Sequence, residues 1–155
     1  MSFRFSALAV DEFQHLFEAD KEELSRHSVH RLVVDSKPGY PCRVSLQDAE
    51  IGETVLLMNY EHQSAATPFR SSHAIFVRER ASQARPEVGT IPEMFRHRLH
   101  SVRAFDNAGM MIDADVIDGA RLESLIERLF ANPAVQDLHI HNAKQGCYAV
   151  KVTRQ

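Results

Sequence analysis

The C-terminal end of the chain carries its clearest alternation of apolar and polar positions, in two short runs at 137–142 and 147–152. Because successive side chains of a strand point to opposite faces, each run predicts a strand with one apolar face. Pairing His141 with Cys147 gathers the large apolar side chains on one side and leaves His139, His141 and Cys147 on the other. The predicted apolar face comprises Leu138, Ile140, Tyr148, Val150 and Val152. We therefore expect a hairpin with one core-facing side and one side free for polar chemistry.

A second hairpin is predicted at 99–106 and 110–117, on either side of a turn that ends in Gly109. A glycine in the left-handed conformation is common in three-residue hairpin turns, since it has no Cβ to clash. The predicted register brings Arg103 opposite Asp113 and pairs apolar residues with one another. We interpret the charged pair as a surface contact of small energy, not as half of a paired-carboxylate site.

Residues 119–130 have apolar side chains at helical spacing, and Asp118 before them is a suitable N-cap. The apolar stripe consists of Leu122, Leu125, Ile126, Leu129 and Phe130. Asn132-Pro133 ends the helix, since the residue before a proline avoids helical geometry. The helix connects the two hairpins, as a crossover if the strands that flank it run parallel.

The first half of the chain predicts shorter elements. They are a helical stretch over 11–27 interrupted near Asp20, strands over 29–35, 42–46, 54–60 and 74–78, a polar loop over 61–72 and a long polar segment over 79–92. The whole pattern indicates an α+β fold. We expect a mixed, mainly antiparallel sheet with helices packed mostly on one face, ending strand-strand-helix-strand-strand. The length of 155 residues favours a single domain over 1–155.

Composition narrows the classes of partner. The formal net charge is −3 and no basic block is present, so a nucleic-acid partner is not expected. No apolar run approaches the ~20 residues of a membrane span, and the N-terminus lacks the apolar core of a signal peptide. We therefore expect a cytoplasmic protein without a membrane partner. In that compartment the two cysteines, Cys42 and Cys147, are expected to be free thiols.

Several motifs together resemble one known family. They are Pro38-Gly39-Tyr40-Pro41-Cys42-Arg43-Val44-Ser45-Leu46, Gly52-Glu53-Thr54-Val55-Leu56-Leu57 with Tyr60 and His62, Pro68-Phe69-Arg70-Ser71-Ser72, Ile75-Phe76-Val77-Arg78-Glu79, and His139-Ile140-His141-Asn142-Ala143 with Gly146-Cys147-Tyr148. This combination, spread from about Phe5 to Arg154, looks like the bacterial family called domain of unknown function 1203. The chain differs from the family pattern at Phe69, where Tyr is usual, and at His73-Ala74, where Gly-Pro is usual. The resemblance implies a small cytosolic bacterial protein and brings no reaction class with it.

The residues with the richest chemistry lie at predicted strand ends and in the loop over 61–72. The candidate ligand-binding residues are Cys42, Arg43, Tyr60, His62, Arg70, His139, His141, Asn142 and Cys147. Because the guanidinium fork suits carboxylates and phosphates, we expect a pocket for a small polar or anionic molecule. Catalytic residues stay unassigned, since no phosphate-binding glycine loop, serine nucleophile elbow or Cys-x-x-Cys motif is present.

Three alternatives stay open. A face of the C-terminal hairpin, or an exposed edge strand, could serve interaction or homo-oligomerisation without catalysis. His139, His141 and Cys147 could bind zinc in a zinc-dependent enzyme, with Cys42 as a fourth ligand. In the simplest alternative the histidines are ordinary hydrogen-bonded residues and Cys147 is a small buried apolar side chain. A concave pocket that holds these side chains favours ligand binding, and a flat exposed face favours interaction.

Overall fold

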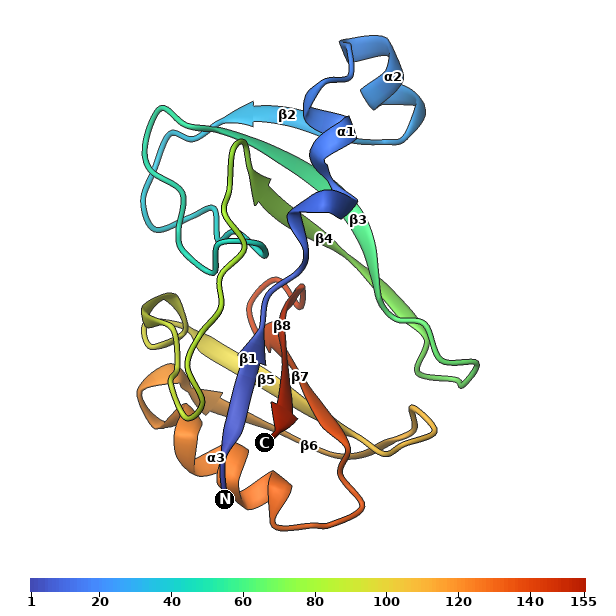
Figure 1. Ribbon diagram of the computed structural model, residues 1–155, viewed down its shortest axis with the longest axis vertical. Coiled ribbons are helices and arrows are strands. Elements are labelled where there is room, and N and C mark those ends of the chain that lie inside the picture. The colour runs from blue at the N-terminus through green and yellow to red at the C-terminus, as the bar shows by residue number, and fades with distance from the viewer.

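Eight strands and three helices make up the computed structural model, which describes all 155 residues. The strands are β1 (Phe3–Ser6), β2 (His30–Val33), β3 (Thr54–Gln63), β4 (Ser71–Arg78), β5 (Leu99–Phe105), β6 (Met111–Asp118), β7 (Asp137–Asn142) and β8 (Tyr148–Arg154). The helices are α1 (Gln14–Phe17), α2 (Lys21–Arg26) and α3 (Leu122–Phe130), with 3₁₀ turns at Val10–Glu12, Glu93–Phe95 and Gly119–Arg121. The larger sheet has the order β1-β8-β7-β5-β6 and the smaller has the order β2-β3-β4 (Figure 1).

The α+β class is confirmed, but the expected single mixed sheet is divided into two sheets whose ladders are all antiparallel. The segment over 42–46, which was predicted to be a strand, does not form one, so it does not join the two sheets. Cys42 makes only an isolated parallel bridge to Phe76. The chain then turns, with Leu46 N donating to Cys42 O and Leu46 at a φ of 52°.

The predicted order strand-strand-helix-strand-strand is confirmed in the second half, by β5, β6, α3, β7 and β8. Both β6 and β7 are antiparallel to β5, so they run parallel to each other on its two sides, and α3 connects them. Asp118 caps the helical segment as predicted, accepting a hydrogen bond from Ala120 N at 2.9 Å. The whole predicted stripe of α3 is buried against the larger sheet, where it packs with Phe5, Val102, Leu138, Ile140 and Val150.

The short N-terminal helices cover the smaller sheet, so the helices are divided between the two sheets and do not share one face. The predicted interruption at Asp20 is confirmed, since its carboxylate caps α2 by accepting from Glu23 N at 2.8 Å. A second apolar cluster forms here, and it includes Phe13, Leu16, Leu24, Leu56, Met58 and Ile75. Each sheet therefore has its own core.

The predicted register of the second hairpin is wrong over most of its length. Gly109 does adopt a left-handed φ of 81°, and Phe105 lies opposite Met111 as expected. A bulge next to the turn then shifts the ladder by one residue, so Asp113 lies opposite Ala104 instead of Arg103. Asp113 instead pairs with Arg128 of α3, whose Nη1 lies 3.6 Å from the carboxylate.

The predicted pairing of His141 with Cys147 is also wrong. Ile140 lies opposite Val150, and His141 lies opposite Tyr148, so β8 contains one extra residue, Ala149. The bulge has a physical reason, because strict alternation would expose one of these three consecutive residues of β8. With the bulge, Ala149 and Val150 are buried in the core of the larger sheet while Tyr148 is buried in that of the smaller sheet.

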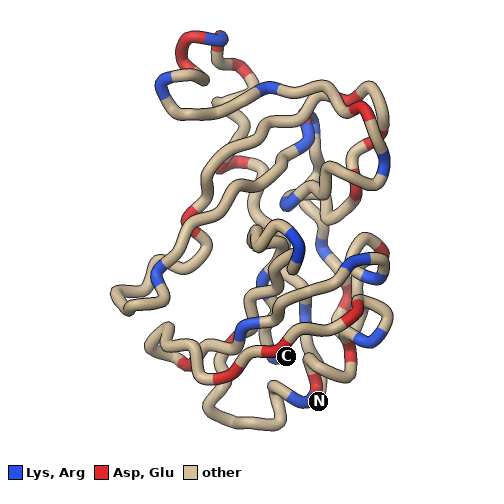
Figure 2. Tube along the Cα trace, turned by 180° about the vertical axis from the view of Figure 1, so that it is seen from behind, with Lys and Arg blue, Asp and Glu red and all other residues tan.

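Charged residues of both signs are interspersed along most of the trace (Figure 2). No helix qualifies as a membrane span, and the longest, α3, has nine residues.

Candidate functional site

Four histidines from three strands meet between the two sheets. His62 comes from β3, His73 from β4, and His139 and His141 from β7. The ring centroid of His62 lies 4.8 Å from that of His73 and 4.7 Å from that of His141, and the His73 and His141 centroids are 4.9 Å apart. His139 joins through a 2.8 Å contact between its Nδ1 and His62 Nδ1. We call these four residues the histidine cluster.

A bulge in β3 positions His62. The strand was predicted to end at Tyr60, but it continues to Gln63, and the ladder with β4 shifts between Glu61 and Gln63. His62 is therefore the extra residue, and a bulge redirects the side chain that it adds. On the other sheet, β7 is hydrogen-bonded on both sides, to β8 and β5, so His139 and His141 sit on a strand with little freedom to move.

The ring nitrogens of the cluster are unevenly satisfied. His141 Nδ1 lies 3.0 Å from Gly146 O, and because a carbonyl only accepts, this nitrogen carries the proton. His141 Nε2 is then a bare acceptor, buried with no hydrogen-bond partner, and His73 Nδ1 is buried without a partner as well. His62 Nε2 lies 2.9 Å from Ser71 Oγ.

The imidazoles of the cluster are neutral at ordinary pH. Burial lowers the pKa of His62 to about 2, with a further contribution from neighbouring His141. Burial also lowers the pKa of His141 to about 3 and that of His139 to about 4, although Asp137 opposes the latter shift. The pKa of His73 is lowered too, again mainly by burial. Each neutral ring carries one N–H and keeps one nitrogen lone pair, so each histidine of the cluster can present one acceptor nitrogen.

Two tyrosines enclose the cluster from one side. The ring of Tyr148 is stacked on that of His62, with centroids 4.8 Å apart and an interplanar angle of 9°. Burial raises the pKa of the Tyr148 hydroxyl above its ordinary value. Tyr60 stacks on Tyr148 at 6.1 Å and is half-buried, so it adjoins the cluster through another ring.

A pocket of about 520 Å³ adjoins the cluster at His73. The residues of its wall with polar side chains include Arg43, His97, Arg98, Asn142, Lys144 and Cys147. Its apolar wall includes Leu57, Phe76 and Leu99, and no aspartate or glutamate lines it. We call this cavity the basic pocket.

Arg43 of the basic pocket is an unusual arginine, because only 1% of it is exposed and no carboxylate pairs with it. Its Nε donates to Tyr148 O at 2.8 Å, its Nη1 donates to Pro41 O, and its Nη2 lies 3.2 Å from Cys147 Sγ. Burial lowers the pKa of Arg43, and the nearby Cys147 sulfur opposes that shift. A guanidinium held only by neutral groups leaves positive charge at the pocket wall.

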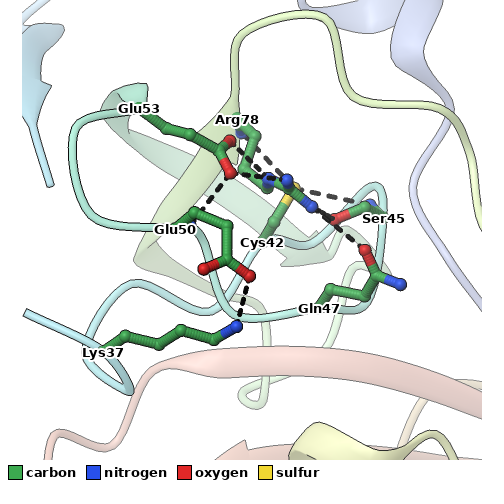
Figure 3. A network of polar contacts seen from close by, with 7 residues as sticks. All are labelled: Lys37, Cys42, Ser45, Gln47, Glu50, Glu53 and Arg78. Carbon is green, nitrogen blue, oxygen red and sulfur yellow. Dashed lines mark hydrogen bonds and ion pairs between the residues drawn. The ribbon is translucent and has the colours of Figure 1, made fainter.

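Arg78 is held in the opposite way, by a carboxylate (Figure 3). Its Nε and Nη2 donate to both carboxylate oxygens of Glu53, at 2.8 and 2.7 Å, and its Nη1 donates to Ser45 and Gln47. Cys42 belongs to this network, because its sulfur accepts from Arg78 N at 3.3 Å. The charge of Arg78 is therefore neutralised within the protein.

The family profile described as "Protein of unknown function (DUF1203)" matches residues 39–154. The chain belongs to this family. The match confirms the resemblance suggested by the motifs. No curated protein and no solved structure matches the chain. The matched range of the DUF1203 family contains the whole histidine cluster, together with Arg43 and Cys147.

The structure divides the predicted ligand-binding residues of this DUF1203 member among several places. Arg43, Asn142 and Cys147 line the basic pocket, while His62, His139 and His141 lie in the cluster. Tyr60 borders the cluster, and Cys42 is buried in the Arg78 network. Arg70 lies apart from both, exposed and paired with Glu61 at 3.0 Å. Both cysteines are free thiols, as predicted.

The structure gives a different set of candidate metal ligands from the one that the sequence suggested. The ligand atoms that approach within 4.8 Å of one another belong to His62, His73 and His141. Cys147 is outside this set, and its sulfur contacts Arg43 and Asn142 instead. His73, missing from the predicted set, pairs directly with Tyr60 across β3 and β4. The prediction of a loop over 61–72 missed this pairing, because both strands extend into that segment.

Proposed function

We propose that the basic pocket binds a small anionic molecule of the carboxylate or phosphate class. The charge balance of its wall carries this proposal, because cationic side chains line it and acidic ones do not. Lys144 forms no ion pair, and Arg43 donates only to carbonyls and to a sulfur. Arg98 and His97 also line the wall, although they contact Asp48 and Glu93.

Burial makes this arrangement favourable for an anion. The field of a buried cation is weakly screened, so a negative group bound at the wall interacts with Arg43 more strongly than it would at the surface. Asn142 adds a neutral donor, and the apolar wall suits the carbon skeleton of a small organic acid. The proposed ligand is therefore one anionic head group with a short apolar body.

Titration calorimetry and thermal unfolding with inorganic phosphate and with butyrate, which has one carboxylate and a short apolar chain, test the proposal. We expect both anions to raise Tm, with affinities that fall as the salt concentration rises. Lys144→Ala should weaken binding by about three- to tenfold, as expected for one partly shielded charge contact. Lys21→Ala, an exposed lysine on α2, is the matched control and should bind like the unmodified protein. Absence of binding at millimolar concentrations, or equal binding by the two variants, would contradict the proposal.

One observation favours the interaction module as a second candidate. β6 is the edge strand of the larger sheet, and it exposes Ile112 by 40% and Val116 by 55%. An exposed apolar edge is a common site of strand pairing. If β6 mediates dimerisation, light scattering should find a dimer that Val116→Lys dissociates. A monomer at all concentrations would reject this candidate.

A further inference from the structure

Two ring nitrogens in the histidine cluster lack the partners that buried polar atoms ordinarily have. His141 Nε2 and His73 Nδ1 are both buried with no hydrogen bond, and His141 itself has no exposed surface. Such unsatisfied groups are rare in folded proteins, since a bound ion or an ordered water ordinarily supplies the missing partner. At His141 the proton is fixed on Nδ1 by Gly146 O, so the unpartnered Nε2 presents a lone pair.

The third histidine, His62, is held by contacts typical of a metal ligand. A ligating histidine ordinarily uses its second nitrogen in a hydrogen bond that orients the ring. His62 Nδ1 lies 2.8 Å from His139 Nδ1, and His139 Nε2 lies 3.6 Å from a carboxylate oxygen of Asp137. The contact with His139 orients the His62 ring and leaves His62 Nε2 beside Ser71 Oγ, while Asp137 Oδ1 lies near His139 without a hydrogen bond to it.

We propose that His62, His73 and His141 form a binding site for a divalent transition metal ion, with zinc the best suited. Their ligand atoms already lie within 4.8 Å of one another. In a tetrahedral zinc site with Zn–N of about 2.0–2.1 Å, the nitrogens are about 3.3 Å apart. To coordinate one zinc ion, each pair of ligand nitrogens must therefore come closer by about 1.5 Å at most, a distance that rotation of the imidazole rings can cover.

The donor types decide the class of ion. Imidazole suits zinc, copper, nickel and iron, whereas calcium and magnesium require oxygen ligands. Three histidines also leave one coordination position for water or another ligand, as in zinc sites of the catalytic type. His73 lines the basic pocket as well, so the proposed metal site adjoins that pocket. Metal binding by these histidines does not require an anion in the basic pocket.

Zinc titration of chelator-treated protein against a competing indicator, with elemental analysis of the complex, tests the site. We expect one zinc per chain. Loss of a residue that only hydrogen-bonds to a metal ligand typically weakens metal binding by about 10–100-fold. His73→Ala and His141→Ala each remove a ligand, so each should weaken zinc binding by at least that factor. At zinc about 100 times Kd, Tm should rise by about 5–11 °C. His30→Ala, which removes an exposed histidine of β2 outside both the cluster and the basic pocket, is the matched control and should bind zinc unchanged.

Cobalt substitution separates this ligand set from the one that includes Cys147. The cobalt complex should show the visible bands of a tetrahedral site without thiolate-to-metal charge transfer, and Cys147→Ala should leave its spectrum unchanged. Thermal unfolding shows whether the His141 variant is folded, and His73, which is only half-buried, gives a second variant with less risk of unfolding. Substoichiometric zinc, or the same affinity in both histidine variants as in the control, would overturn the proposal.

Discussion

The basic pocket and the histidine cluster adjoin at His73, yet burial gives them opposite chemistry. In the cluster, burial keeps the imidazoles neutral, because a histidine can lose its proton at low cost. At the pocket, burial cannot discharge Arg43 in the same way, since a guanidinium stays protonated in proteins. One region therefore presents lone pairs, and the other presents positive charge. The charge of a buried polar side chain thus depends on its intrinsic pKa as much as on its position.

The largest effect that sharpens this comparison is expected from Arg43→Met. The change keeps much of the volume but leaves Tyr148 O and Pro41 O without their donor. Two buried carbonyls without a partner should lower the free energy of unfolding by about 2–5 kcal/mol, measured by urea denaturation. A gain in stability would mean that the buried charge was a net burden and that the pocket wall is not held together by Arg43.

The pH dependence of stability tests the cluster side of the comparison. His62, His139 and His141 have folded-state pKa values below the ordinary 6.5, so the unfolded chain binds more protons as the pH falls. Their contribution is fully present above pH 6.5 and is lost as the pH falls from there toward about 4 and below. One histidine that must stay neutral contributes a slope of about 1.4 kcal/mol per pH unit.

Urea denaturation at pH 7, 6 and 5 measures this slope. His30→Ala, which removes an exposed histidine of β2, is the control and should leave the slope unchanged. Stability that stays flat between pH 7 and pH 5 would show that the cluster accepts protons freely, and the contrast with Arg43 would then disappear.

The smallest effect is expected from Arg128→Ala, a charge outside both regions. Arg128 bridges Asp113 and Asp115 at the exposed face of β6, with all three side chains about half exposed. Exposed ion pairs contribute about 0–1 kcal/mol, so this variant should differ from the unmodified protein by less than about 1 kcal/mol in the same measurement. A loss as large as that of Arg43→Met would mean that burial is not what distinguishes the arginines of this fold.

Local patterns in the sequence were sufficient to predict the helix and the strands in the second half of the chain. The spacing of Leu122, Leu125 and Leu129 predicted α3, and Asp118 predicted its start, because helix periodicity and capping involve residues a few positions apart. Gly109 predicted the turn between β5 and β6 for the same reason. The alternation of Leu138 and Ile140 correctly assigned one face of β7 to the core.

Tertiary structure alone decided the register and the site. The bulge at Ala149 has no local signature, because it is favoured only once two cores must be filled at the same time. The bulge at His62 has none either, because it occurs where the His62 ring contacts His141 of the other sheet. Those bulges turn Tyr148 and His62 toward each other and bring β3 and β4 against β7. The burial of Arg43 depends in turn on Tyr148 O, which lies 105 positions away in the chain. The alternation of apolar and polar residues in the sequence indicates which side chains are buried. The free energy of packing both sheets determines which of these buried side chains contact one another.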